Sequence, residues 1–163
     1  MKRYLIAVLL GCSLGSLHAA GDQRPVKVFV LAGQSNMDGQ AVVDLDGADY
    51  NNGKGTLVQL LRDPAKAPLV RHLRDAQGKW IVRDDVWVRY QPEDAPLLHG
   101  PLTVGFTVYG DAHHFGPELQ FGHVVGDHFN NPVLLIKTAW GGKRLYRDFR
   151  PPSSGGAVGP YYT

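Results

Sequence analysis

A serine lies just after a strongly apolar stretch in the N-terminal part of the chain. The run Val26–Ala32 has almost no polar residue and is followed by the segment Gly33–Met37, which reads Gly-Gln-Ser-Asn-Met. Such a run predicts a central parallel strand buried on both faces. In open α/β sheets the ligand edge lies at the carboxyl ends of the strands, so Ser35 is a candidate nucleophile. The segment is not the Gly-x-Ser-x-Gly elbow of α/β-hydrolases, because its last residue is Met37, and a polar turn remains the alternative interpretation.

A second segment with candidate functional residues opens a predicted helix, which starts at Pro117 and extends to about Phe129. Proline is favoured at the first helical position, and Glu118 places an anion where the helix dipole favours one. Gly122 and Gly126 would let the helix backbone approach a strand closely. Apolar residues at helical spacing predict one face packed on a sheet. These residues are Leu119, Phe121, Val124, Val125 and Phe129.

A third segment combines a second apolar run with a pair of glycines. Val133–Ala139 predicts another buried parallel strand, and Trp140 and the pair Gly141-Gly142 follow it. The order strand, helix, strand predicts a right-handed βαβ unit, whose parallel strands end at the same edge of the sheet. The glycine pair and Ser35 are therefore expected to lie near each other.

These three segments, in this order, resemble the SGNH-type hydrolases of the sialate O-acetylesterase and carbohydrate esterase family 6 group. The similar blocks are Phe29–Met37, Phe115–Glu118 and Leu135–Gly142, and the resemblance runs from about Val26 to the end of the sequence. It implies a flavodoxin-like three-layer α/β/α fold with a parallel central sheet. It also implies hydrolysis of acetyl esters on carbohydrates, either acetylated sialic acid or plant polysaccharide, without a metal or other cofactor.

The resemblance also assigns roles to individual residues. It implies that Ser35 is the nucleophile and that its amide is one donor of the oxyanion hole, with a second donor in Gly141 or Gly142. Either amide of the glycine pair fits this role, since glycine lets the backbone approach the acyl group closely. Three further residues are candidates for supporting the serine loop, although for Glu118 the commoner role is that of an acid at a helix N-terminus. They are Gln34, Asn36 and Glu118.

Two parts of the family pattern are absent from their usual places. Members carry a later Gln-Gly-Glu block and a C-terminal Asp-x-x-His that supplies the general base. We expect both beyond residue 163, so that the chain is the N-terminal part of one domain and is inactive by itself. Asp111–His114 matches Asp-x-x-His, but it precedes the block Phe115–Glu118, whereas the family's dyad follows the last strand. A loop that lines the site or packs beside it is the favoured interpretation.

The remaining chain predicts less regular structure. Between Gly39 and Gly78 we expect a loop-rich excursion with one short helix near Thr56–Arg62. Trp80–Arg83 and Val86–Tyr90 alternate apolar and polar residues, which predicts a β-hairpin at the edge of the fold. Three aromatic residues of this region are expected in the hairpin core, with stacking on sugar as the alternative. They are Trp80, Trp87 and Tyr90.

The N-terminus has the pattern of an export signal. Two basic residues precede the apolar run Leu5–Leu10, and Ala19-Ala20 offers a cleavage site, so residues 1–20 are predicted to be a signal peptide ahead of one domain at 21–163. Leu9–Cys12 also resembles a bacterial lipobox, which would make Cys12 a lipid anchor. Both interpretations place the protein in the periplasm or outside the cell. The apolar run is too short to span a membrane.

The composition excludes several other functions. The 163 residues are 44% hydrophobic and 20% charged, which predicts a globular domain. The formal net charge is only +2 and the basic residues are scattered, so nucleic acid is an unexpected partner. Two rival functions stay open: a non-catalytic carbohydrate-binding domain with the same fold, and a calcium-stabilised adhesion domain built on Asp44–Asp49. The sequence does not indicate an oligomeric state.

Overall fold

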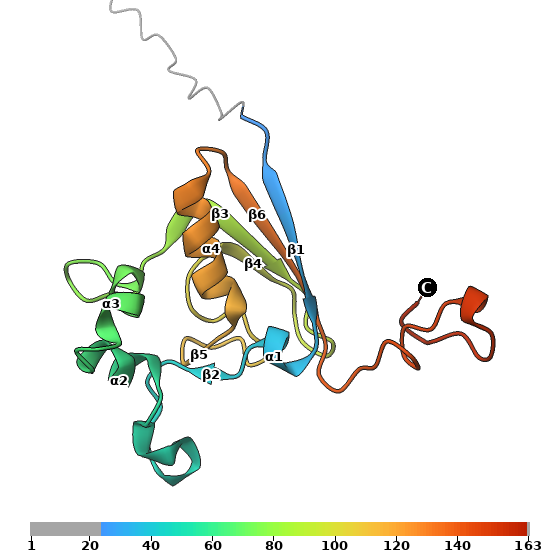
Figure 1. The fold of residues 1–163 in the computed structure, drawn as a ribbon, viewed down its shortest axis with the longest axis horizontal. Coiled ribbons are helices and arrows are strands. Elements are labelled where there is room, and N and C mark those ends of the chain that lie inside the picture. The colour runs from blue at the N-terminus through green and yellow to red at the C-terminus, as the bar shows by residue number, and fades with distance from the viewer. Residues whose placement is uncertain (1–23, 163) are drawn as a thin grey trace, which may run out of the picture.

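The computed structural model describes residues 24–162, so the predicted signal peptide and Cys12 lie outside the described residues. The centre of the fold is a four-stranded sheet with the order β1-β6-β3-β4 (Figure 1). β1, β6 and β3 run parallel, and β4 is antiparallel to β3. The protein is therefore an α/β protein with a mostly parallel central sheet. The strands are β1 (Lys27–Gly33), β6 (Val133–Ala139), β3 (Arg83–Tyr90) and β4 (Leu98–Leu102).

The other elements are short, apart from one helix, as the content of glycine and proline predicts. β2 (Ala41–Val42) and β5 (His114–Phe115) form a small antiparallel pair. The helices are α1 (Ser35–Asp38), α2 (Leu57–Arg62), α3 (Ala67–Val70) and α4 (Pro117–His128), with 3₁₀ turns η1 (Ala48–Gly53), η2 (Arg71–Leu73) and η3 (Pro152–Ser154). α2 confirms the short helix predicted near Thr56, whose side chain caps it by accepting from the Gln59 amide at 3.3 Å. In residues 24–162 no helix has both the length and the apolar character needed to cross a membrane.

Helix α4 covers one face of the sheet, as its periodicity predicted. Phe121 and Val125 pack against a core of buried residues from three strands. Gly126 lies so close to β3 that a Cβ atom there would be 2.5 Å from Val86 Cγ2, and Gly122 meets Leu102 in the same way. The expected close approach of helix and strand is confirmed. Val124 is an exception, because 57% of it is exposed on the outer side of the helix.

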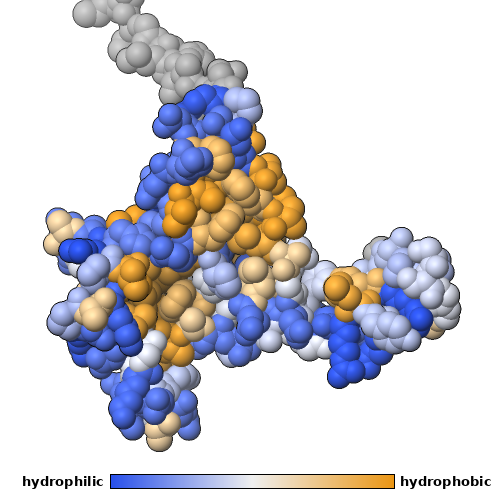
Figure 2. Space-filling view, in the orientation of Figure 1, coloured by the Kyte–Doolittle hydropathy of each residue, from blue (hydrophilic) through white to orange (hydrophobic). Residues whose placement is uncertain are grey.

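The opposite face of the sheet is open in the described residues. On this face Val28 is 53% exposed and Val30 is 64% exposed. Figure 2, which views the molecule from the α4 side, shows that apolar residues also gather at the surface there, toward β1. β1 pairs only with β6 and therefore forms an edge of the sheet. The expectation of a central strand buried on both faces is wrong for this structure. The described residues supply two layers, the sheet and α4, and do not include a helix layer over this second face.

The predicted hairpin at residues 80–90 is also wrong. β3 starts at Arg83 and runs between β6 and β4, so it is an internal strand rather than an edge hairpin. Asp85 does not form a turn; its carboxylate binds the Arg83 guanidinium within the strand, at 2.7 Å. Trp80 stacks instead on Arg74, whose guanidinium carbon is 4.1 Å from the ring centre. Tyr90 is buried in the main fold and Trp87 is 48% exposed, so no hairpin core exists.

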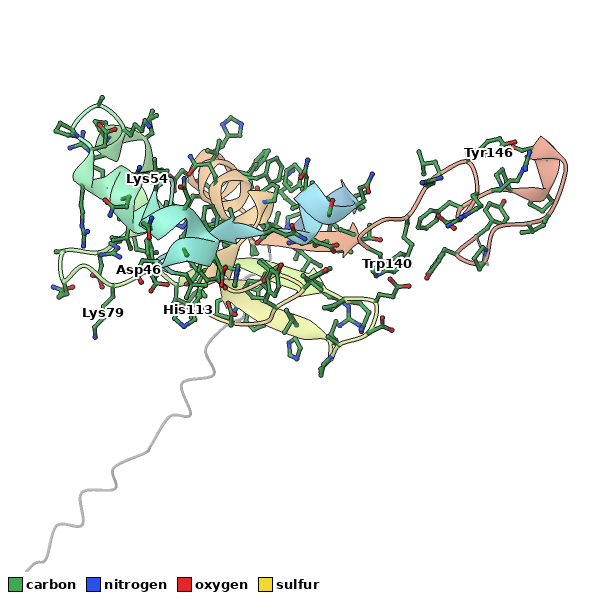
Figure 3. The ribbon with its side chains drawn as sticks, turned by 90° about the horizontal axis from the view of Figure 1, so that it is seen from below. Asp46, Lys54, Lys79, His113, Trp140 and Tyr146 are labelled. Atoms are coloured by element: carbon green, nitrogen blue, oxygen red, sulfur yellow. The ribbon has the colours of Figure 1, made fainter. Side chains whose placement is uncertain are left out.

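The segment after β6 leaves the sheet at its C-terminal edge and extends past Trp140 toward Tyr146 (Figure 3). Phe149 stacks on Trp140 with 5.9 Å between the ring centres, and Tyr161 packs against both rings. The Arg144 amide donates to Asp148 at 2.7 Å, which ties the start of this segment to its own later residues. The segment is thus held by its own contacts and by contacts with the chain after β3, where Lys143 binds Glu93 at 2.7 Å and Trp140 Nε1 donates to the Gln91 carbonyl at 3.0 Å.

Candidate active site

Ser35 lies where the sequence predicted, at the C-terminal edge of the sheet. β1 ends at Gly33, and α1 begins at Ser35. β1 pairs with β6 along its whole length, up to the pair Gly33↔Ala139, so the two strands end level with each other. The turn at Gly141-Gly142, here called the glycine turn, therefore lies at the same edge of the sheet as α1, here called the serine helix.

The chain turns sharply between β1 and α1. A Cβ atom on Gly33 would lie 2.7 Å from Met37 Cβ, so only glycine fits without a shift of the helix. The Gln34 carbonyl accepts the amides of both Met37 and Asp38 at 2.8 Å. Since α1 has only four residues, its own hydrogen bonds cannot hold it in place. Its position must be fixed by neighbouring elements.

The end of α1 packs directly on the backbone that leads into α4. Gly39 has φ +88°, and a Cβ atom there would lie 2.6 Å from the Cα of Gly116. This backbone contact joins two of the three segments that the sequence singled out. It also explains why glycine stands at position 39, because any side chain there would push the two backbones apart; a Cβ atom on Gly116 would instead meet Glu118 and Lys137.

A buried lysine on β6 binds the C-terminal end of α1. Lys137 on β6 is 2% exposed. Its Nζ donates to the Asp38 carbonyl at 2.9 Å, to the Phe106 carbonyl at 2.6 Å and to Glu118 Oε2 at 2.7 Å. An ammonium group has three hydrogens to donate, and all three have acceptors here. Lys137 was not among the predicted site residues, although a lysine inside an apolar strand is a signal, since lysine is rarely buried unless it is paired.

Glu118 completes this ion pair and is itself fully buried. Its second oxygen accepts from the Gly116 amide at 3.0 Å, so the carboxylate caps the start of α4 while binding Lys137. Burial raises the pKa of Glu118, and the Lys137 ammonium opposes this shift. Both carboxylate oxygens accept hydrogen bonds and Lys137 Nζ uses three donors, a pattern that fits an ionised pair. Glu118 reaches the serine helix only through Lys137.

Asp38 and Tyr90 add a second buried link to α1. The Tyr90 hydroxyl donates to Asp38 Oδ1 at 2.5 Å and lies 3.3 Å from the Ala139 carbonyl. Burial, with the nearby Asp38 carboxylate, raises the pKa of Tyr90 far above its usual value. A Cβ atom on Gly141 would lie 3.3 Å from Asp38 Oδ2, so Asp38 sits between the serine helix and the glycine turn. Sequence reasoning missed Asp38 and placed Tyr90 in a hairpin core.

Two hollows flank α1, and both have the size of small-molecule sites. One, of about 660 Å³, includes Gln34 in its lining; the other, of about 500 Å³, includes Asn36. In residues 24–162 neither of these side chains makes a hydrogen bond. The first hollow is lined by Ala32, Gly33, Gln34, Thr138, Lys143, Arg144, Leu145 and Phe149. A substrate could therefore approach the serine helix from either side.

The Asp-x-x-His segment forms a pair of its own. His114 Nδ1 is 2.8 Å from Asp111 Oδ1, and the His114 ring stacks on Tyr109 with 4.1 Å between centres. Within the described residues, no hydrogen bond or ring contact joins His114 to Ser35. The geometry agrees with a loop pair that packs beside the site, and it gives Ser35 no base.

The acidic stretch Asp44–Asp49, on which a calcium-stabilised domain would depend, makes a contact of another kind. Asp44, the first residue of the acidic stretch 44–49, binds His113 Nδ1 at 2.7 Å. Across the part of the chain that the structure describes, no cluster of three or more His, Cys, Asp or Glu residues could hold a metal ion. The acidic stretch has no second feature there that points to calcium.

Comparison with known proteins identifies the family. The model of the family described as carbohydrate esterase, sialic acid-specific acetylesterase, matches residues 25–162. Comparisons with curated proteins and with solved structures gave no significant match. The matched region includes α1, the start of α4 and the turn after β6, the three segments whose order first indicated an esterase. The chain thus belongs to the sialic acid-specific acetylesterase family of carbohydrate esterases.

Proposed function

We propose that the protein is a serine esterase that removes O-acetyl groups from carbohydrates and that Ser35 is its nucleophile. Membership of the family indicates carbohydrate acetylesterase activity in general. The observation that carries the finer assignment is the placement of Ser35 on a four-residue helix at the ligand edge of the sheet, with Asp38 of the same helix against the Gly141 turn. The leader expected from the sequence would place this activity outside the cytoplasm.

The reaction would follow two steps. Ser35 Oγ attacks the acetyl carbonyl while a base takes the hydroxyl proton, and the carbonyl oxygen becomes an oxyanion. The oxyanion collapses by breaking the bond to the sugar oxygen, which takes the proton and leaves as a hydroxyl. Water then attacks the acetyl-serine and releases acetate, which regenerates the serine. The substrate class is an O-acetylated sugar, whether sialic acid or a plant polysaccharide.

Backbone amides would stabilise the oxyanion. We assign this role to the Ser35 amide and to one amide of the pair Gly141-Gly142. Gly142 has φ +72°, a conformation that glycine adopts easily and other residues rarely do. Preorganised donors of this kind are usually the largest single contribution to catalysis of acyl transfer.

The general base is assigned to a residue outside 24–162. A serine hydroxyl is a weak nucleophile at neutral pH without a base. No histidine among residues 24–162 makes a hydrogen bond with Ser35, and His114 is engaged with Asp111. The proposal therefore requires a histidine from another part of the natural protein.

Substitution of Ser35 tests the proposal in the full natural chain. Acetate release from an acetylated sugar is measured for the parent, for Ser35→Ala and for Ser153→Ala, a matched control in the exposed turn η3. We expect Ser35→Ala to lose roughly 10⁴-fold or more in turnover, with an unchanged circular dichroism spectrum, and the control to keep parental turnover. Retained turnover in Ser35→Ala would overturn the assignment. Sugar binding without turnover by the parent would favour the non-catalytic binding domain.

A further inference from the structure

We propose that Lys137 is a positioning residue for the esterase reaction and that its ammonium group fixes the serine helix relative to the Gly141-Gly142 turn. It acts through Glu118 and Asp38, with Tyr90 as a second link. The inference rests on the proposed role of Ser35 as the nucleophile. It adds a residue that touches neither substrate nor nucleophile and still controls the rate.

The first step of the argument concerns the end of α1. A helix of four residues leaves its last carbonyl groups without partners inside the helix. The Asp38 carbonyl is one of these, and Asp38 is 4% exposed, so water does not replace the missing partner. Lys137 Nζ meets this carbonyl at 2.9 Å. The ammonium group thus determines where the helix that carries Ser35 ends.

The second step concerns what holds Lys137 itself. Its Nζ is bound by the Phe106 carbonyl, in the segment between β4 and β5, and by Glu118 on α4. Its stem rises from β6, which continues directly into the glycine turn. The ammonium group is therefore fixed by three separate parts of the fold. The serine helix and the glycine turn are thus both attached to the same strand, β6.

The third step is the link through the side chain of Asp38. Its Oδ1 accepts from Tyr90 on β3, and its Oδ2 lies next to Gly141. The helix is thus held by its last carbonyl from β6 and by its last side chain from β3. With both contacts made, α1 can neither rotate nor slide along the sheet edge without breaking a buried hydrogen bond.

The consequence for catalysis is a loss of rate with little loss of binding. A displacement of about 1 Å at a reacting group can cost about 100-fold in rate even when the mutation lies away from the chemistry. Lys137 is buried and lines neither hollow, so its removal takes no side chain away from their walls. Turnover should fall while KM changes little.

The main test uses a double variant that leaves no buried charge unpaired. Lys137→Met with Glu118→Gln removes both charges; glutamine keeps the length of glutamate, and methionine is one atom shorter than lysine. Leu135→Ala is the matched control: it is fully buried on the same strand, packs toward α4 and makes none of the hydrogen bonds of the network. Both variants are made in the full natural chain, and kcat and KM for an acetyl ester are measured well below both melting temperatures. We expect kcat of the double variant to fall about 100-fold with KM within about threefold, and kcat of Leu135→Ala to stay within about threefold of the parent.

Three results would overturn the inference. A folded double variant with parental kcat would do so, and so would a Leu135→Ala variant that loses as much kcat as the double variant, because the effect would then follow from stability alone. If the double variant does not fold, Tyr90→Phe tests the other end of the network, with about a tenfold fall in kcat expected and parental kcat as the contrary result. Ser35→Ala separates the two proposals. An active Ser35→Ala variant overturns the proposed function, whereas an inactive one beside an unaffected double variant overturns only the role of Lys137.

Discussion

Two of the acid–base pairs in the described residues, Asp111–His114 and Glu118–Lys137, differ in almost every respect. Asp111 and His114 are three residues apart, match a known catalytic spacing and bind each other at the start of β5, where Asp111 is 40% exposed. Glu118 and Lys137 are 19 residues apart, match no motif and have fully buried side chains. Only the second pair is connected to the helix that carries Ser35. The comparison teaches that a local spacing guarantees local contact, whereas a connection to the site depends on topology.

The two pairs also differ in what they contribute to the stability of the fold. A partly exposed pair is screened by water and contributes little to stability. A buried pair contributes little net stability as a unit, but each partner makes the other indispensable, because an unpaired charge in the interior is costly. Glu118–Lys137 should therefore tolerate joint replacement and resist single replacement. Asp111–His114 should tolerate both.

The largest effect is expected from removing only one member of the buried pair. Lys137→Met leaves the Glu118 carboxylate buried with a single remaining partner, the Gly116 amide. We expect a loss of about 3–5 kcal/mol in the free energy of unfolding, most of which returns when Glu118→Gln is added. Urea denaturation of the single and double variants measures this. Equal stability of the two would show that the pair is not coupled as the geometry indicates.

A substitution at Gly39 should have the next largest effect. Gly39→Ala puts a methyl group 2.6 Å from the Gly116 Cα, at φ +88°. Gly55→Ala is the matched control, because Gly55 has φ +86° with nothing within 4 Å of the added carbon. Both variants pay about 1–3 kcal/mol of backbone strain, but only the first displaces α1. We expect turnover to fall strongly in Gly39→Ala and to persist in Gly55→Ala; equal turnover of the two variants would contradict the account.

Substitution of the motif pair should change activity little. His114→Gln removes the ring that binds Asp111 and stacks on Tyr109, with an expected cost of about 1 kcal/mol in stability. Turnover should stay within about threefold of the parent, as read from acetate release beside the Ser35→Ala variant. If His114→Gln is as inactive as Ser35→Ala, the comparison fails and Asp111–His114 becomes the catalytic dyad.

The smallest effect is expected at the surface pair Asp44–His113. The Asp44 carboxylate raises the pKa of His113 above its usual value of 6.5. Because the folded-state pKa is raised, the pair stabilises the fold below about pH 6.5, and this contribution disappears as the pH rises through the raised value. Asp44→Asn should lower the melting temperature slightly at pH 5.5 and leave it unchanged at pH 8.5. An equal decrease at both pH values would mean that the titration of His113 is not involved.

The sequence predicted the regular elements well where the signal was local. The apolar runs at residues 26–32 and 133–139 are β1 and β6, and the periodic stretch from Pro117 is α4. The hairpin at residues 80–90 failed because Asp84 and Asp85 resemble a turn in sequence but lie within β3, where Arg83 binds Asp85. The burial of β1 was overestimated, since strand composition does not reveal which neighbours a sheet provides.

The site was predictable only in outline. The position of Ser35 follows from the end of an apolar strand, and the exit of Gly141-Gly142 from the same edge of the sheet follows from the parallel pairing of β1 and β6. Lys137 and Asp38 are 99 residues apart and Tyr90 is 52 residues from Asp38, so no local spacing contains their contacts. A single charged residue inside an apolar strand was the one available signal. It indicates that a partner exists without identifying that partner.

The central claim is that Ser35 is the nucleophile, and covalent labelling tests it most directly. The full natural chain and its Ser35→Ala variant are treated with a fluorophosphonate, and the modified peptide is located by mass spectrometry. Among residues 24–162 the other serines are Ser153 and Ser154, far from Ser35 in sequence and therefore on separate peptides. The account predicts a single adduct on the peptide that contains Ser35, formed in step with loss of turnover and absent from Ser35→Ala. An adduct on another residue that abolishes turnover, or labelling that persists in Ser35→Ala, would contradict it.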